Sequence, residues 1–174
     1  MGQVVFDASG VIVDGADNAL VPASLTGFVD TVHVDAGETL SLEGGFNGID
    51  GSNDFVKTGA GELILTGANS HPGKTIVEAG TLRISADDQL GDTTSGTDRV
   101  VVKSGATLLI EETLTLNQNR GIVLEAGATI AVADGKTVTY NGKITGDSGP
   151  AIKSGGGELK LTNPDNFSEG VTVE

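Results

Sequence analysis

The chain has 174 residues, of which 27 are glycine and 3% are aromatic, with no cysteine or tryptophan and a formal net charge of −14. The acidic excess argues against nucleic acid or an anionic membrane as a partner, because both require clustered lysine and arginine. The lack of cysteine excludes a disulfide framework and a thiolate metal site. No stretch approaches the roughly 20 apolar residues that cross a bilayer, so no membrane insertion is expected. The length and the absence of a linker predict one domain over residues 1–174.

A four-residue phrase returns six times along the chain: an aliphatic residue, an acid or lysine, then Ala, Ser or Thr, and finally glycine. Successive glycines of this phrase are 21 to 28 residues apart, a period typical of a solenoid. Glycine suits the corners of such a fold, where the backbone takes angles that other residues resist. The phrases are Val34-Asp35-Ala36-Gly37, Val56-Lys57-Thr58-Gly59, Val77-Glu78-Ala79-Gly80, Val102-Lys103-Ser104-Gly105, Leu124-Glu125-Ala126-Gly127 and Ile152-Lys153-Ser154-Gly155.

Each phrase is followed by two apolar residues separated by one position. Alternation of this kind predicts a strand with one buried face. The pairs are Leu40 and Leu42, Leu63 and Leu65, Leu82 and Ile84, Leu108 and Ile110, Ile130 and Val132, and Leu159 and Leu161. The residues between them, expected to face outward, are Ser41, Ile64, Arg83, Leu109, Ala131 and Lys160. Half of these are apolar, so the outer surface is not expected to be uniformly polar.

About 22 residues per repeat leave room for two or three short strands, and no amphipathic helix is evident. Stacked repeats would place each apolar pair above the next and bury one continuous column. The sequence therefore predicts an all-β protein, a parallel β-helix of about eight coils. At about 4.8 Å per layer, the rod would be about 40 Å long.

A longer duplication overlies the short one. Residues 56–78 read VKTGAGELILTGANSHPGKTIVE and residues 152–174 read IKSGGGELKLTNPDNFSEGVTVE. The first copy, with Lys57-Thr58-Gly59-Ala60-Gly61, Thr66-Gly67-Ala68-Asn69 and Gly73-Lys74-Thr75-Ile76-Val77, resembles the passenger-associated repeat of Gram-negative autotransporters. The second copy departs from that pattern where Asn163-Pro164-Asp165 replaces the Gly-x-Asn turn.

The resemblance implies a right-handed β-helical stalk carried outside the cell, on the surface of a Gram-negative bacterium after export through the outer membrane. Such passengers include adhesins, autoaggregation factors, toxins and proteases, and we expect the adhesin or autoaggregation type. The expected partners are host or bacterial surface receptors, or further copies of the chain. Because the sequence ends at Val173-Glu174, inside a repeat, we expect a fragment of a longer passenger. No catalytic, cofactor-binding or metal-binding residue is predicted.

The main alternative is an enzyme. Gly146-Asp147-Ser148-Gly149-Pro150 is similar to the nucleophile loop of chymotrypsin-like serine proteases, and His33 and His71 lie upstream of Ser148. Nucleophilic chemistry would require a histidine beside Ser148 and an acid that orients it. However, one residue of the protease loop is missing before the proline, and turn residues explain the segment equally well. A polysaccharide lyase would need an acidic calcium site and a base such as Arg99 or Lys103.

A third alternative is a calcium-, glycan- or ice-binding solenoid. The segment from Gly44 to Asp54 and the acidic loop of Asp87, Asp88 and Asp92 contain oxygen ligands that calcium prefers. Asp, Asn and Gly are also ordinary turn residues, and the spacing shows no convergence on one point. The pairs Thr113-x-Thr115 and Thr137-x-Thr139 would place hydroxyls on one strand face, in only two repeats. Asn117, Asn119 and Asn141 are predicted to form turns or ladders between coils.

Overall fold

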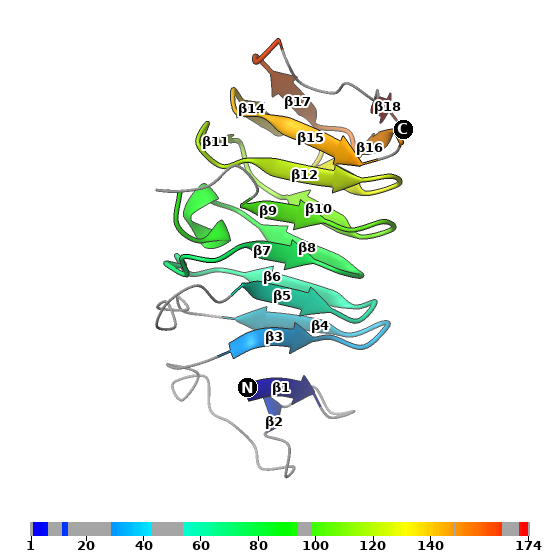
Figure 1. Ribbon diagram of the computed structural model, residues 1–174. Coiled ribbons are helices and arrows are strands. Elements are labelled where there is room, and N and C mark those ends of the chain that lie inside the picture. The colour runs from blue at the N-terminus through cyan, green and yellow to red at the C-terminus, as the bar shows by residue number, and fades with distance from the viewer. Residues whose placement is uncertain are drawn as a thin grey trace.

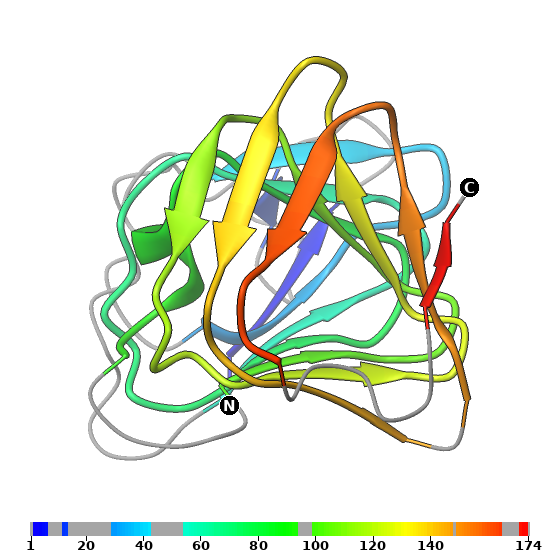
Figure 2. The same cartoon turned by 90° about the horizontal axis from the view of Figure 1, so that it is seen from above.

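The computed structural model describes residues 2–6, 12–13, 29–42, 54–93, 99–147, 149–164 and 171–173. Within these ranges the chain forms three sheets and one short 3-10 helix, η2 (Asp87–Leu90). The strands stack along one axis from the N-terminal end to the C-terminal end (Figure 1). Figure 2, a view along this axis, shows the chain winding around a common interior.

The first sheet has the order β15-β12-β9-β7-β5-β3-β1-β2, and all its pairs are parallel except β1 with β2. Its strands are β1 (Gly2–Phe6), β2 (Ile12–Val13), β3 (Val29–His33), β5 (Phe55–Thr58), β7 (Thr75–Val77), β9 (Val100–Val102), β12 (Ile122–Glu125) and β15 (Ile144–Asp147). Parallel neighbours that are separated in sequence by a whole coil are the defining feature of a solenoid.

The second sheet is parallel throughout and has the order β18-β16-β13-β10-β8-β6-β4. Its strands are β4 (Thr39–Leu42), β6 (Glu62–Leu65), β8 (Thr81–Ile84), β10 (Thr107–Ile110), β13 (Thr129–Val132), β16 (Ala151–Ser154) and β18 (Val171–Val173). The third sheet contains β11 (Leu114–Leu116), β14 (Thr137–Tyr140) and β17 (Glu158–Leu161), also in parallel register.

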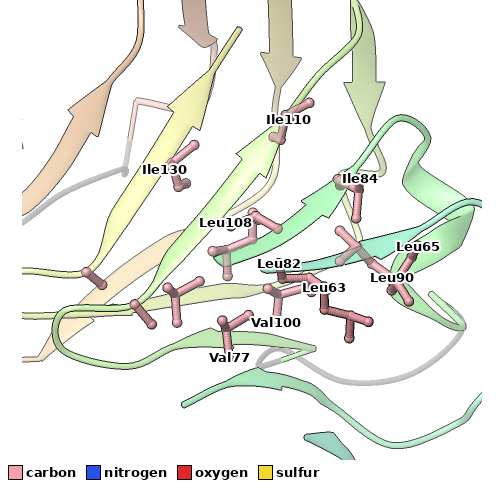
Figure 3. Close-up of a cluster of buried hydrophobic side chains, with 14 of the residues drawn as sticks. Leu63, Leu65, Val77, Leu82, Ile84, Leu90, Val100, Leu108, Ile110 and Ile130 are labelled. Carbon is pink, nitrogen blue, oxygen red and sulfur yellow. The ribbon is translucent and has the colours of Figure 1, made fainter. Parts of the chain in front are cut away.

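The interior is a column of aliphatic side chains from successive coils (Figure 3). In the second sheet, Leu63, Leu82, Leu108 and Ile130 follow one another in register, and each is at most 1% exposed. Burying such a side chain stabilises the fold by about 1.5–3 kcal/mol. The predicted all-β solenoid, with its stacked column, is therefore confirmed, although the prediction of about eight coils is slightly too high for the seven strands of the second sheet.

Five of the six predicted apolar pairs lie in the second sheet, but the sixth does not. Leu159 and Leu161 belong to β17 in the third sheet, where they pair with Val138 and Tyr140 of β14. The expectation that all six pairs form one stack is thus wrong. The sixth phrase joins β16 of the second sheet to β17 of the third, one corner later than the other five phrases, which join the first sheet to the second.

The six phrase glycines all lie at corners, with φ between 67° and 85°. A seventh corner of the same kind, Val132-Ala133-Asp134-Gly135, joins β13 to β14, and Gly135 has a φ of 70°. This corner does not match the four-residue phrase because its small residue, Ala133, comes before its acid, Asp134. The corner between β15 and β16, by contrast, contains Gly149 and Pro150 instead of the phrase.

The two long repeats occupy different sides of the solenoid but make the same contacts. The first repeat passes from the first sheet to the second and the second repeat from the second sheet to the third. In the first repeat the amide of Gly61 donates to Val34 O (2.9 Å) and the amide of Thr66 to Leu42 O (3.2 Å).

In the second repeat the amide of Gly157 donates to Val132 O (3.1 Å) and the amide of Thr162 to Tyr140 O (3.0 Å). Both repeats thus rest in the same way on the corner and strand of the coil below. The sequence motif therefore specifies a corner together with its stacking, not a particular side of the rod.

Two corner glycines allow the stacking contact to be separated from backbone strain. Gly37 and Gly59 both have positive φ, but a Cβ at Gly37 meets nothing within 4 Å, whereas a Cβ at Gly59 would lie 2.2 Å from Val34 O. We expect Gly37→Ala to lower the free energy of unfolding by about 1–2 kcal/mol, and Gly59→Ala to lower it by roughly 1–3 kcal/mol more through the clash. Urea unfolding of both variants measures this, and equal losses would contradict the stacked corner.

Candidate functional site

Three buried cations, Lys57, Arg99 and Arg120, are the most unusual polar groups of this acidic chain. Lys57 lies on β5 at an inward position, and its Nζ donates to the carbonyl oxygens of Thr58 (2.9 Å), Gly59 (2.7 Å) and Ala79 (3.0 Å). Burial lowers the pKa of Lys57 to about 8. The lysine therefore satisfies carbonyls at two consecutive corners, whereas Lys153 donates to the carbonyls of Gly155 and Gly157 within a single corner.

Arg120 is fully buried and ties η2 to the coil above it. Its Nε and Nη2 donate to Oδ1 and Oδ2 of Asp87, each at 3.1 Å. Further donors reach the carbonyl oxygens of Asp87 (2.9 Å), Leu90 (2.8 Å) and Gly91 (3.1 Å). The hydroxyl of Tyr140 donates to the carbonyl of Arg120, and burial is the main reason that the pKa of Tyr140 rises to about 12.

Arg99 performs the same task at a neighbouring turn. Its Nε and Nη2 donate to the carbonyl oxygen of Asp92 at 3.1 and 2.9 Å, and its Nη1 donates to the carbonyl of Pro72. A guanidinium with its donors on backbone carbonyls, and only 6% exposed, is a poor catalytic base. The described residues therefore give no support to Arg99 as the base of a lyase.

His71 is buried between Phe55, Thr75 and η2. The hydroxyl of Thr75 donates to Leu90 O (3.0 Å), so the 2.8 Å contact between His71 Nε2 and Thr75 Oγ1 assigns the ring proton to Nε2. Nδ1 of His71 is buried without a hydrogen-bond partner. Burial, and then the positive charges of Arg99 and Arg120, lower the pKa of His71 to about 4, with Asp54 opposing. The ring is neutral at pH 7.

An open groove of about 460 Å³ lies beside η2. Its described lining is polar and includes Ser70, Asp88, Thr93 and Asn117. Of its four charged lining residues, Asp87 and Arg120 are bound to each other, and Asp88 and Asp92 are the other two. Among the described residues, this groove is the feature that best matches the predicted glycan-binding alternative. None of its described lining residues is aromatic.

The residues of the predicted protease alternative are far apart. Ser148 itself lies outside the described residues, but Asp147 ends β15, which is five strands away from β3 and His33 in the first sheet. At about 4.8 Å per strand, this separation is about 24 Å, whereas a catalytic hydrogen bond spans about 3 Å. His33 contacts Thr58 Oγ1 (3.0 Å) and Asp35 Oδ1 (3.1 Å) instead. The neighbours of Ser148 form a corner stacked on the one below, where the amide of Gly127 donates to Pro150 O (3.1 Å).

The predicted calcium ligands are only partly described. Residues 44–53 lie outside the described ranges, and Asp54 accepts a hydrogen bond from the amide of Lys74 (2.7 Å). In the other acidic loop, Asp87 is held by Arg120 and also accepts from the amide of Asn117 (3.0 Å). Among the described residues there is no group of three His, Cys, Asp or Glu side chains that could hold a metal.

The predicted threonine pairs and asparagine contacts both lie between neighbouring coils of the third sheet and its turns. Thr115 pairs in register with Thr139, and Thr113 Oγ1 accepts from the amide of Thr137 (3.1 Å). At the next strand, Lys160 replaces the threonine, so the array has two rows. Asn117 and Asn141 contact side chains of neighbouring coils, Thr93 and Gln118, at 3.4 Å each, whereas Asn119 forms a local turn.

Sequence reasoning missed the burial of Lys57 and Arg120. For Lys57 a signal was present, because it shares the inward parity of Phe55 on the same strand. Arg120 follows a turn and carries no periodic signal that would have revealed it.

Comparisons with known proteins agree with the predicted resemblance. The model of the passenger-associated-transport-repeat matches residues 55–84 and 152–174. The chain is 34% identical over 136 residues to the adhesin BmaC autotransporter of Brucella suis biovar 1 (strain 1330), an alignment that covers 67% of this chain. The chain spans only 4% of the length of that adhesin. No solved structure matches the chain, and among the described residues no helix is long and apolar enough to cross a membrane.

The burial of His71 predicts a specific loss of stability in acid. Its pKa is about 4 in the folded chain and about 6.5 in the unfolded chain, so the unfolded state binds more protons between these values. The free energy of unfolding should therefore fall by up to about 3 kcal/mol from this group as the pH drops from 6.5 to 4. His71→Gln keeps an N–H donor for Thr75 without titrating, so its stability should fall less steeply in urea titrations across this pH range. Parallel curves for the two proteins would contradict the assignment.

The Arg120 cluster can be compared with a surface ion pair of the same residue type. Arg120→Met removes the guanidinium donors from the Asp87 carboxylate and from the carbonyls of Asp87, Leu90 and Gly91, and we expect a loss of about 3–5 kcal/mol in the free energy of unfolding. Arg83 pairs with Glu62 (2.8 Å) and Glu111 (3.2 Å) on the outer surface, and Arg83→Met should cost about 1 kcal/mol or less. Equal losses in chemical unfolding would show that Arg120 is not the buried anchor of η2.

Proposed function

We propose a mechanical function for this chain, which is a segment of an autotransporter passenger and carries two passenger-associated transport repeats: it serves as a stalk that displays other parts of an adhesin. The stalk would lie outside the cell, on the surface of a Gram-negative bacterium. Its ends would be continuous with neighbouring coils, and the receptor would be contacted by a separate part of the passenger.

The observation that carries this proposal is the unbroken parallel register. Strands from β3 to β15 in the first sheet and from β4 to β18 in the second sheet pair coil upon coil. The hydrogen bonds of parallel sheets run between neighbouring strands, so here they lie along the rod axis. A pull along the rod is therefore shared among the sheets, which is the property that a stalk requires.

The polar interior also favours a structural role. The buried cations donate to backbone carbonyls of the fold itself, and the described acidic residues do not gather into a metal site. The adhesin BmaC autotransporter, whose name gives its function, contains a similar segment in 4% of its length. A short segment of a long adhesin is well suited to spacing.

A chimera tests the proposal. The segment of the Brucella adhesin that matches this chain would be replaced by this chain, and bacteria displaying the chimera would be compared with the parent for surface display and attachment to host cells. We expect both to stay within about twofold of the parent. Deletion of the segment, as the control, should impair display because it breaks the continuous stack.

The purified chain provides the second arm. If it bound host cells itself, or blocked attachment of the parent bacteria at micromolar concentration, the chain would be a receptor-binding module and the stalk proposal would be wrong.

A further inference from the structure

The turn between β14 and β15 contains an asparagine followed by a glycine, Asn141-Gly142. It lies near the C-terminal end of the solenoid (Figure 1). The side-chain amide of an asparagine can be attacked by the backbone nitrogen of the next residue, which closes a five-membered succinimide ring. The attack meets least hindrance where the next residue is glycine, because glycine has no Cβ. Asn141 is exposed, so water can reach the ring and ammonia can leave.

The surroundings of each reacting group favour this attack. The attacking nitrogen is that of Gly142, whose amide donates no hydrogen bond to any other residue that the structure describes. The carbonyl under attack belongs to the Asn141 side chain, and its Oδ1 accepts a hydrogen bond from the hydroxyl of Thr162 at 3.0 Å. This donor polarises the carbonyl and faces the oxygen on which negative charge develops. The leaving Nδ2 lies 3.4 Å from Gln118 Oε1, which is a weak contact.

The packing of the turn requires the glycine of this pair. A Cβ at Gly142 would lie 2.3 Å from Tyr140 Oη. The same hydroxyl contacts the carbonyl oxygens of Arg120 and Lys143. Tyr140 is fully buried, and a close-packed interior leaves its ring no room to move aside. A larger residue at position 142 would therefore disturb the core, and the reactive pair is a consequence of how this turn packs.

We propose that Asn141 is a deamidation site, at which the chain modifies itself without an enzyme. The nitrogen of Gly142 loses its proton to water and forms a bond to Cγ of Asn141. The bond from Cγ to Nδ2 then breaks, and Nδ2 takes up a proton and leaves as ammonia. Water opens the succinimide at Cγ to give aspartate, or at the backbone carbonyl to give isoaspartate, in which the chain continues through Cγ. The net reaction consumes one water and releases one ammonia.

Either product changes the contacts of this turn with the neighbouring coils. A carboxylate at position 141 still accepts from the hydroxyl of Thr162, but it presents an oxygen to Gln118 Oε1 where Asn141 presents a donor. In isoaspartate the main chain is longer by one carbon, between Tyr140 and the Lys143 carbonyl that its hydroxyl contacts at 3.2 Å. The reaction also adds a negative charge to a chain that carries −14. It is independent of the stalk proposal, because a stalk does not require it.

The coil below contains a matched internal control. Asn117 follows β11 as Asn141 follows β14, and these two strands pair in register. The residue after Asn117 is Gln118, and Oδ1 of Asn117 accepts from the amide of Asn119 at 3.0 Å. Because the Cβ of Gln118 hinders the attack that glycine permits, Asn141 should deamidate roughly tenfold faster than Asn117 or more.

Peptide mapping by mass spectrometry measures both sites in one sample. The purified chain would be incubated at physiological temperature at mildly acidic and mildly alkaline pH, and each asparagine followed by its gain in mass. Asn141 should convert to aspartate and isoaspartate, and faster at alkaline pH, because the attacking nitrogen must lose a proton. The map separates this site from Asn47-Gly48, the other Asn-Gly pair of the sequence, which lies outside the described residues. Conversion of Asn141 no faster than that of Asn117 would overturn the proposal.

Variants of the exposed Thr162 test the activating hydrogen bond. Thr162→Val removes the hydroxyl at constant size and should slow the conversion of Asn141 by about threefold to tenfold, less than the loss of an oxyanion donor in a site without water. Thr162→Ser keeps the hydroxyl and should restore the rate. In concentrated urea, where the chain is unfolded, Thr162→Val and the parent should convert equally fast. An unchanged or higher rate in folded Thr162→Val would show that the hydroxyl does not activate Asn141.

Discussion

The solenoid depends on the close stacking of one corner upon the next. Strands of successive coils are about 4.8 Å apart, and at some corners this spacing leaves no room for a side chain between the backbones. A Cβ on Gly59 would lie 2.2 Å from Val34 O, and one on Gly155 would lie 2.3 Å from Val132 O. At Gly59, Gly80 and Gly155 glycine is thus required by the backbone of the neighbouring coil as well as by its own φ, whereas at Gly37, Gly105 and Gly127 the positive φ alone requires it. The recurrence of the phrase follows from the positive φ that all six corners share.

The corners also create a demand for hydrogen-bond donors, because carbonyl oxygens that leave a strand have no amide above them. Buried carbonyls without a donor are costly. The chain meets the demand with long cationic side chains: Lys57 reaches three carbonyls and Arg120 another three. An otherwise acidic chain thus places basic groups inside, where they bind backbone dipoles as well as a carboxylate. This arrangement explains why its buried cations have backbone carbonyls as partners.

The sequence predicted those parts of the fold that repeat and failed at those that occur once. The glycines and the alternating pairs were readable because every coil meets the same stacking constraint. The pair Leu159 and Leu161 was assigned to the wrong sheet because the motif encodes a corner, and the upper coils have one corner more. η2 and its anchor Arg120 could not be foreseen, because a single guanidinium bound to Asp87 and nearby carbonyls has no periodicity.

The same stacking separates the positions that the fold constrains from those that it leaves free to vary. Inward positions such as Leu82 and Leu108 contact the coils above and below, so a substitution there disturbs three layers at once. Outward positions such as Ile76 and Arg83 contact only their register neighbours and solvent, and the fold tolerates either an apolar or a charged residue there. The stacking of equivalent positions converts any preference on the outer face into a stripe along the whole rod. The outer surface of a solenoid can therefore become apolar or charged one coil at a time, without any change in the interior that stabilises the fold.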